Sequence, residues 1–510
     1  MLGVDVGTTN LKAAAFDDKG RILAIETTPT VLHQSAGELR HYDGAEIWSS
    51  VAALVRAVRA DLPAERMVDA VSVTGMGEAV VPLDGEGDPL GPVIPWFDAR
   101  SATHAQQLAD TLSAEIIFGI TGLDCHPIFS LAKIAWMRDH HPDIVRRVAV
   151  WLPVVDFVNF RLTGVAGTDF TEASRTLLLD LSNNRWSEQM IRAAGIDAAT
   201  LPPIRASGTR LGSITRAAAA ECGLGEGTPV VVGGHDHLCG SLAAGILIGK
   251  RILDSSGTAE SFVGISQPGQ SVPGEFRGLR LGRYLDPSRF VTWGGIIASG
   301  RSVDWAIDRL ASMAEWGNEG SRVSYDTVNA AVADVPRGAR SLLYIPHLRG
   351  CGAPHWNPQS RGAFVGLVDT HTQHDMLRAV FEGICFEART IVELTETVFG
   401  STVDTLNAVG GGTRSAVWQQ IKADVTGKRV EMPEVDEATV LGAALLAGVG
   451  IGVFPDLETA SRATYRARTV YTPNAEAHER YGAFFRVYEQ LYRTLAPLND
   501  ALGALESSGG

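Results

Sequence analysis

An aspartate between two histidines follows an apolar run that ends in glycine. The run 229–233 (PVVVG) has the pattern of a buried strand, and Asp236 stands where a helix is expected to begin. A carboxylate at the end of a strand can accept the proton of a hydroxyl group during phosphoryl transfer. Two other interpretations stay open. Asp236 could cap the helix, or His235, Asp236 and His237 could ligate a metal ion, although adjacent loop residues rarely all point at one ion.

The turn at residues 7–9 (Gly-Thr-Thr) has the composition of a phosphate-binding loop. Glycine lets phosphate oxygens approach backbone N–H groups, and Thr8 and Thr9 add two hydroxyls. Lys12 follows three residues later, and Asp5 lies near the end of the preceding strand, in a position to hold a magnesium ion through water. The alternative is an ordinary tight turn.

A second turn of the same kind, Gly257-Thr258, follows an apolar run at residues 251–255. Together the two turns could hold the phosphates of ATP from both sides. Gly411 and Gly412, between an expected strand and an expected helix, suit the ribose or adenine of a nucleotide, or else form a packing turn. The chain has no GxxxxGK[ST] loop, which excludes the common P-loop, and no GxSxG elbow, which disfavours an α/β-hydrolase.

Two carboxylates and an indole lie in neighbouring segments, at Glu78, Trp96 and Asp98. Carboxylates accept hydrogen bonds from hydroxyl groups, and an aromatic face packs against C–H groups. This combination is typical of a surface that binds a polyhydroxylated ligand. The same residues could instead form an ion pair between Asp98 and Arg100 beside a core tryptophan.

The elements that must position these residues alternate between strands and helices. In the first half we expect a helix at 45–61 and strands at 2–6, 11–16, 21–28, 70–74, 79–83 and 229–233. In the second half the strand–turn–strand unit returns, and we expect strands at 251–255, 260–265, 406–409 and 429–432 and a helix at 415–426. The pattern predicts two α/β domains with partly parallel sheets, at 1–240 and 241–500.

The composition is that of a soluble globular protein with more than one domain. A chain of 510 residues is too long for one ordinary core, and 45% apolar residues exclude extensive disorder. With 44 Lys and Arg against 58 Asp and Glu, the net charge of −14 argues against nucleic acid or an anionic membrane as a partner. No uncharged apolar stretch approaches the length of a membrane span. The five cysteines, without CxxC spacing, indicate reduced thiols in a cytoplasmic protein.

Together these motifs resemble the FGGY family of carbohydrate kinases. The most specific match is residues 362–367 (GAFVGL), followed after seven residues by 375–382 (DMLRAVFE), which fits the second signature of that family. The first signature is nearly complete across residues 130–140, while Ile128 departs from its leading position. The resemblance covers essentially the whole chain.

The resemblance implies two actin-like (ribonuclease H-like) ATPase domains with a deep cleft between them, and MgATP as the phosphoryl donor. By position, it makes Asp236 the catalytic base and Asp5 the residue near magnesium. The implied ATP-binding positions are Thr8, Thr9, Lys12, Gly257, Thr258, Gly300, Asp304, Gly411 and Gly412. The implied substrate positions include Gly77, Glu78, Ile128, Asp236 and His237. Members of the family are often dimers, which leaves room for a homodimer.

Residues that differ from those of related kinases indicate which sugars are suitable substrates. Glycerol kinases have arginine and tyrosine where this chain has Gly77 and Ile128, which argues against glycerol. Xylulokinases have Met-His in place of Gly77-Glu78, whereas the segment around His235 and residues 255–258 (SSGT) is similar to L-fuculokinases. We therefore expect a sugar or polyol kinase acting on a ketopentose or deoxyketohexose. The rival hypotheses are an actin-like nucleotide switch, a sugar sensor without turnover and a hydrolase with a metal at His235-Asp236-His237.

Overall fold

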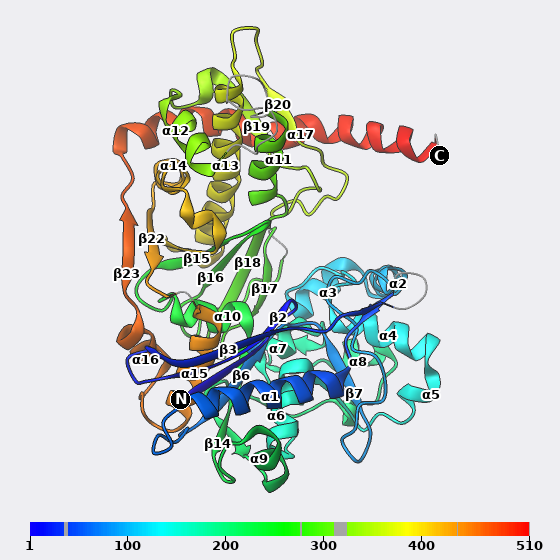
Figure 1. Ribbon diagram of the computed structural model, residues 1–510. Helices are drawn as coiled ribbons and strands as arrows, with labels where there is room; N and C mark the ends of the chain where they lie inside the picture. The colour runs from blue at the N-terminus through cyan, green and yellow to red at the C-terminus, as the bar shows by residue number, and fades with distance from the viewer. Residues whose placement is uncertain (35–38, 276–277, 311–323, 436, 509–510) are drawn as a thin grey trace.

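Two mixed sheets, one from each half of the chain, form the body of the molecule (Figure 1). The computed structural model describes residues 1–34, 39–275, 278–310, 324–435 and 437–508. Within these residues the first sheet has six strands and the second has seven. The two sheets share one pattern: an antiparallel meander that continues into parallel strands.

The first sheet has the order β13-β14-β6-β1-β2-β3. β1 pairs antiparallel with β2 and parallel with β6, which in turn pairs parallel with β14. Helices α1, α6 and α9 pack together over this sheet. The bounds are β1 (Leu2–Val6), β2 (Asn10–Phe16), β3 (Ile22–Pro29), β6 (Val71–Gly75), β13 (Arg210–Ser213), β14 (Pro229–His235), α1 (Gly44–Asp61), α6 (Val154–Thr163) and α9 (Arg216–Cys222).

The second sheet has the order β17-β18-β16-β15-β21-β22-β23 and repeats the first. β15 pairs antiparallel with β16 and parallel with β21, as β1 does with β2 and β6. Its bounds are β15 (Arg251–Ser256), β16 (Glu260–Ile265), β17 (Arg280–Arg283), β18 (Phe290–Ile296), β21 (Thr405–Val409), β22 (Arg429–Pro433) and β23 (Ala467–Tyr471). The helices and hairpin around it are α11 (Gly300–Leu310), α12 (Tyr325–Asp334), β19 (Leu343–Ile345), β20 (Ala363–Val365), α13 (Gln373–Phe399), α14 (Ala416–Thr426), α16 (Leu457–Thr464) and α17 (Ala475–Ser508).

Segments inserted into the first half form a side lobe with its own apolar core, and a smaller apolar cluster packs this lobe against the second half. In Figure 1 this lobe lies to one side of the first sheet, facing the second. Its elements are β7 (Val80–Leu83), α2 (Ala102–Leu112), α3 (Ala114–Thr121), α4 (Ser130–His140), α5 (Pro142–Val145), β8 (Val150–Pro153), α7 (Phe170–Arg175), β10 (Leu179–Asp180), β11 (Arg185–Trp186) and α8 (Glu188–Ala194). Smaller pairs are β4 (His33–Gln34) with β5 (Arg40–His41), and β9 (Thr168–Asp169) with β12 (Ile204–Arg205).

Two helices between the sheets, α10 (Asp236–Ala243) and α15 (Ala438–Gly450), join the two halves. They pack so closely that a Cβ at Gly442 would lie 1.9 Å from the carbonyl oxygen of Cys239. Although α15 comes late in the chain, it packs against β1, β6 and β14 of the first sheet. A Cβ at Gly3 in β1 would lie 2.0 Å from the carbonyl oxygen of Val440. Glycine at these two positions therefore permits the interdomain contact.

The described residues agree with two features expected from composition. None of the helices in the described ranges combines the length and the low polarity needed to cross a membrane. All five cysteines, which are Cys125, Cys222, Cys239, Cys351 and Cys385, are free thiols.

Candidate active site

Asp236 is the first residue of α10 and directly follows β14, the strand next to the edge strand β13 in the first sheet. His235 is the cap residue of this helix, and the N–H of His237 lies 3.2 Å from Nδ1 of His235 and donates to Oδ1 of Asp236 at 2.5 Å. The Asp236 side chain is 27% exposed, and its Oδ1 lies 2.9 Å from Nδ1 of His235. Burial acts to raise the pKa of Asp236, but the two histidine rings outweigh it and hold the pKa below its ordinary value. The group is therefore an ionised acceptor at neutral pH.

A pocket of about 320 Å³ opens beside Asp236 between the two halves of the chain. From the first half it is lined by Thr8, Met76, Gly77, Glu78, Trp96, Ile128, Arg175, His235, Asp236 and His237. From the second half it is lined by Ser261, Arg280, Trp293, Gly294, Gly295 and Trp356. We call it the Asp236 pocket. It brings together every predicted substrate residue except Asp98.

Glu78 is held firmly at the wall of this pocket. Its backbone has a φ of 64°, and its carbonyl oxygen accepts hydrogen bonds from Ser130 Oγ at 3.0 Å and Lys133 Nζ at 3.2 Å. Its carboxylate accepts the Nε–H of Arg175 at 2.6 Å. The Arg175 guanidinium also lies 5.1 Å from the ring of Trp293, in the second half. Glu78 and Arg175 thus form a charge-compensated pair within the first half, and the guanidinium of Arg175 contacts the second half through Trp293.

Aromatic rings and a second arginine complete the pocket. The Arg280 guanidinium pairs with both oxygens of Asp124, at 2.5 and 2.8 Å, and lies 4.0 Å from the ring of Trp356. Trp96 is 40% exposed, and its Nε1–H donates to Thr8 Oγ1 at 3.1 Å. This bond connects the wall of the pocket to the turn at residues 7–9.

Gly77 leaves room for the histidine beside the catalytic candidate. A Cβ at this position would lie 2.6 Å from the ring of His235. The imidazole therefore occupies the space that a side chain at 77 would need. The absence of a side chain at Gly77 thus allows His235 to lie beside Asp236.

Asp98 does not line the Asp236 pocket. It is buried, and it accepts hydrogen bonds from Arg100 Nε at 2.9 Å and Nη2 at 2.8 Å, and from the N–H of Arg40 at 3.0 Å. Although burial opposes it, the bonds from Arg100 lower the pKa of Asp98 to about 2. Its position supports the alternative of an ion pair and does not support the expected contact with substrate.

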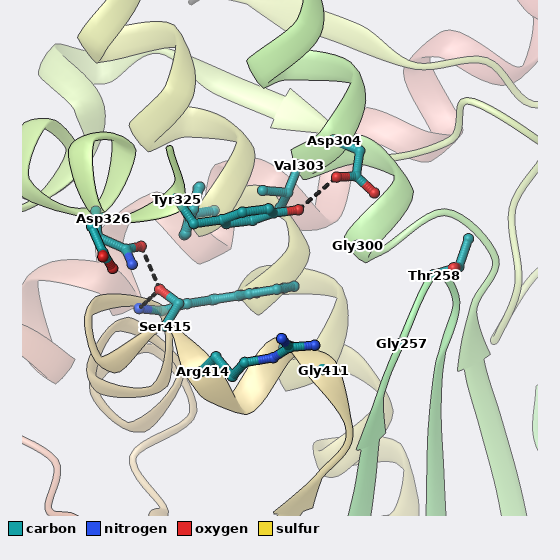
Figure 2. Close-up of a pocket in the computed structure, with 14 residues that line it drawn as sticks. Gly257, Thr258, Gly300, Val303, Asp304, Tyr325, Asp326, Gly411, Arg414 and Ser415 are labelled. Atoms are coloured by element: carbon teal, nitrogen blue, oxygen red, sulfur yellow. Dashed lines mark hydrogen bonds between the residues drawn. The ribbon is translucent and has the colours of Figure 1, made fainter. Parts of the chain in front are cut away.

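A second pocket, of about 440 Å³, lies within the second half and contains most of the predicted nucleotide residues. Figure 2 shows the Gly257-Thr258 turn at one end, with Tyr325 and Arg414 on opposite sides. We call it the Tyr325 pocket. It is lined by Gly257, Thr258, Gly300, Val303, Asp304, Tyr325, Asp326, Asn329, Phe381, Gly411, Gly412, Arg414, Ser415 and Trp418.

The start of α11 packs directly on the Gly257-Thr258 turn. The N–H of Gly300 donates to the carbonyl oxygen of Gly257 at 3.1 Å, and a Cβ at Gly300 would lie 2.4 Å from that oxygen. Glycine at 300 is therefore required for this contact. Four residues on, Asp304 accepts the hydroxyl of Tyr325 at 2.6 Å (Figure 2). The aromatic side chains and the turn form a site of the shape and chemistry suited to a nucleotide.

A buried ionic cluster supports this turn from below. Lys422 of α14 makes ion pairs with Asp254 and, at 2.5 Å, with Glu260. Its Nζ also donates to Ser256 Oγ at 3.0 Å, and Ser299 Oγ donates to Glu260 at 2.6 Å. These side chains fix both strands of the β15–β16 hairpin that carries Gly257 and Thr258 at its tip.

Asp5 lies on the first sheet near Asp236. One carboxylate oxygen, Oδ1, is buried and accepts no hydrogen bond from the described residues. Burial, and secondly the Asp236 charge, raise the pKa of Asp5 to about 8. A buried, unpartnered oxygen beside a second carboxylate fits a hydrated divalent cation, which would supply the missing positive charge.

The other predicted residues of the first turn are placed differently. Thr8 lines the Asp236 pocket, and Lys12 forms an ion pair with Glu437 in a third pocket that also contains Asp5 and Gly411. Thr9 is exposed on the turn, and its carbonyl oxygen accepts the N–H of Thr30 at 2.9 Å. Of the three, Thr9 is not among the residues that line these pockets.

Several lining residues were missed at the level of sequence. Arg175 carried a usable signal, since a single arginine in the otherwise uncharged run 173–179 (ASRTLLL) must find a buried partner. Arg280, Trp293 and Trp356 carried none, because they reach the Asp236 pocket from the opposite half of the chain. Tyr325 likewise enters the nucleotide-type pocket from a helix with no recognisable motif.

Comparison with known proteins gives a consistent result. Sequence profiles of the FGGY family of carbohydrate kinases match the chain twice, the N-terminal domain at residues 1–243 and the C-terminal domain at residues 255–451. The chain is 30% identical over 505 residues to the xylulose kinase of Bacillus subtilis (strain 168), covering 98% of each. It is 28% identical to the L-xylulose/3-keto-L-gulonate kinase of Escherichia coli (strain K12), covering 97% of each.

Solved structures agree on the fold. The crystal structure of xylulose kinase from Rhodospirillum rubrum superposes with a TM-score of 0.90 at 28% identity, covering 98% of this chain and 99% of that one. This similarity, together with the repeated sheet order, confirms the predicted pair of actin-like α/β domains.

Proposed function

The chain belongs to the FGGY family of carbohydrate kinases and is an ATP-dependent sugar kinase, and we propose that Asp236 is its catalytic base and that its substrate is a neutral ketose. The observation that carries this proposal is the Asp236 pocket, in which an ionised carboxylate faces a cavity lined by indoles and by paired charges. The comparisons lend no support to the alternative of a nucleotide switch without turnover.

The proposed reaction is direct transfer of the γ-phosphoryl group. Asp236 accepts the proton of a substrate hydroxyl as its oxygen bonds to the γ-phosphorus; the bond from that phosphorus to the β-bridging oxygen breaks, and ADP leaves. Thr8 and the backbone of the turn at 7–9 would meet the phosphates from one side, and Gly257 and Thr258 from the other. Closing the interdomain pocket would exclude water and so limit wasteful hydrolysis of ATP.

Asp5, with Asp236 nearby, would hold the magnesium ion of MgATP through water. The buried, unpartnered oxygen of Asp5 supports this assignment. When bound, magnesium neutralises part of the phosphate charge. Lys12, although engaged with Glu437, remains a candidate for the same phosphate region because both it and Asp5 line the third pocket.

The charges of the pocket favour a neutral ketose over a sugar acid. Arg175 is paired with Glu78, and Arg280 is paired with both oxygens of Asp124. A substrate carboxylate would have to break one of these pairs and would also face Asp236. A ketose of the xylulose, ribulose or fuculose type offers hydroxyls to Glu78 and C–H faces to Trp96 without that cost.

The test is a coupled ADP-release assay with MgATP and a panel of substrates. The panel contains D-xylulose, L-xylulose, D-ribulose, L-ribulose, L-fuculose, L-rhamnulose, D-gluconate, xylitol, ribitol and glycerol. We expect the highest kcat/KM for one of the ketoses. A preference for D-gluconate would contradict the argument from paired arginines, and a preference for glycerol would contradict the ketose assignment.

The turn at Gly257-Thr258 yields a prediction about ATP. In Thr258→Ala, one hydrogen bond to a charged phosphate is lost, so we expect the KM for ATP to rise about tenfold or more. The KM for the sugar should change much less, because Thr258 lines the Tyr325 pocket and not the Asp236 pocket. Steady-state kinetics with each substrate varied in turn measure both constants. Thr111→Ala, on the exposed face of α2, is the control; the reverse pattern of KM changes would argue against a phosphate contact.

Trp96 yields the matching prediction for the sugar. Removal of the indole in Trp96→Ala should raise the sugar KM by about 2- to 10-fold, the usual range for one aromatic contact. Trp96→Phe keeps an aromatic face and should lose less, although it also loses the bond to Thr8. An equal rise in the sugar KM in both variants would show that the hydrogen bond to Thr8, and not the aromatic face, contributes to sugar binding.

A further inference from the structure

A cluster of metal-ligating side chains lies in the second half of the chain, apart from the residues that line the Asp236 and Tyr325 pockets. His347, Cys351 and Glu387 each offer one ligand atom, and these three atoms lie within 4.8 Å of one another. All three residues are buried, with exposed fractions of 4%, 1% and 8%. Among the residues that the structure describes, no other group of three or more His, Cys, Asp or Glu side chains has its ligand atoms this close together.

The orientation of His347 fits a ligand. Its Nδ1 lies 2.8 Å from Ser360 Oγ, so an Nδ1–H can donate to that hydroxyl. In that tautomer the lone pair of Nε2 faces Glu387, whose Oε1 is 3.3 Å away. Nε2 is buried and makes no hydrogen bond within the described part of the chain. Support of one ring nitrogen by an outer partner is the usual arrangement of a metal-bound histidine.

Glu387 and Cys351 are also positioned by neighbours. The hydroxyl of Tyr488 in α17 donates to Glu387 Oε1 at 2.7 Å. The backbone N–H of Cys351 donates to the carbonyl oxygen of Asn357 at 2.8 Å, which closes the loop that carries the thiol. Three elements therefore meet at the cluster: α13, α17 and the loop after β19.

We propose that His347, Cys351 and Glu387 bind one divalent transition-metal ion of the zinc class. A thiolate and an imidazole select zinc over magnesium or calcium, which prefer oxygen ligands. Three protein ligands leave one tetrahedral position for water. The thiol of Cys351 loses its proton when the ion binds. The competing interpretation is a metal-free ion pair between His347 and Glu387 next to an inert thiol.

The metal site would fix a loop that reaches the Asp236 pocket, the proposed sugar site. Residues 347–356 run from His347 to Trp356, which lines the Asp236 pocket and lies against Arg280. Ala353, halfway along, donates its N–H to the carbonyl oxygen of Gly295, another lining residue, at 3.0 Å. An ion at the base of this loop would tie it to α13 and α17.

The test is metal content, measured on the full-length protein. After treatment with EDTA, dialysis against zinc and passage over a desalting column, we expect close to one zinc per chain by elemental analysis. Cys351→Ser and His347→Gln should each lower this ratio to a small fraction. Cys385→Ser, which removes a buried thiol of α13 that is not part of the cluster, is the matched control and should retain zinc.

Cobalt gives a second readout that needs no variant. Cobalt(II) bound to the wild-type chain should show a thiolate-to-metal charge-transfer band, which cobalt at the oxygen ligands near Asp5 cannot produce. Absence of this band, or zinc retained equally by Cys351→Ser, would overturn the proposal. Because the spectrum is recorded on the wild-type protein, misfolding of a variant cannot imitate that result.

Discussion

Replacing Asp236 by asparagine is expected to lower the rate of sugar-dependent ADP release by about 10²–10⁴-fold, the contribution of a positioned general base. Asparagine has nearly the same shape but cannot accept the proton of the sugar hydroxyl. The fold should survive, because the side-chain oxygen of asparagine can still accept the N–H of His237 at the start of α10. ATP should still bind, because the Tyr325 pocket is built entirely from the second half of the chain. The coupled assay measures the rate, and calorimetric titration with ATP measures binding.

The control for this substitution is Asp197→Asn, which alters an exposed aspartate that caps a short 3-10 helix at Ala198–Thr200. It should leave kcat and both KM values close to those of the wild type. Turnover within about a factor of ten of wild type in Asp236→Asn would contradict the assignment of the base. Loss of ATP binding in the same variant would contradict the separation of the two pockets.

Replacing Lys422 by methionine is expected to destabilise the protein by about 3–5 kcal/mol, the usual cost of removing one partner from a buried ion pair. Methionine fills a similar volume, but Asp254 and Glu260 are then left buried without a compensating cation. The loss of stability should affect the second domain, because Asp254 and Glu260 lie on its β15–β16 hairpin. Chemical denaturation followed by tryptophan fluorescence measures it.

The matched control is Lys428→Met. Lys428 lies six residues further along and pairs with Glu396 at 2.6 Å, but both side chains are partly exposed to solvent. Such a pair contributes about 1 kcal/mol or less. If Lys422→Met lowers the free energy of unfolding by no more than Lys428→Met does, the ionic cluster does not stabilise the hairpin. In that case the cluster also does not support the Gly257-Thr258 turn at the tip of the hairpin.

Much of the fold could be predicted because its elements carry local patterns. The strands expected at 2–6, 251–255 and 406–409 and the helix expected at 45–61 agree with β1, β15, β21 and α1 to within a residue. The strand–turn–strand unit expected to return in the second half is observed as β15–β16, which pairs as β1–β2 does. By contrast, the two-residue strands of the side lobe have no period to detect.

The site could be predicted only where a motif marks it. Asp236 and Gly257-Thr258 end strands that are recognisable by themselves, and both line pockets. Asp98 and Arg100 are two residues apart, and the sequence alone did not decide whether the carboxylate faces substrate or the guanidinium; packing decides for the guanidinium. Arg280 and Trp356 reach the Asp236 pocket only through the interdomain arrangement, which no local pattern contains.

The division of the chain into 1–240 and 241–500 stays a prediction. The two sheets separate between β14 and β15, close to that boundary. The helices are not divided at this boundary, because α15 belongs to the second half of the chain and packs against β1, β6 and β14 of the first sheet. The boundary in sequence is therefore not a boundary in packing.

The placement of α15 has a consequence for biosynthesis. On the ribosome, β1, β6 and β14 are complete long before Ala438–Gly450 emerges to cover them. At about 5–20 residues per second, synthesis of the intervening segment takes roughly 10–40 s. During that time an apolar face of the nascent first domain has no cover from its own chain. Chaperone demand should therefore be highest while the second half is being translated, and a message truncated before residue 438 should yield an aggregating product, not a free-standing first domain.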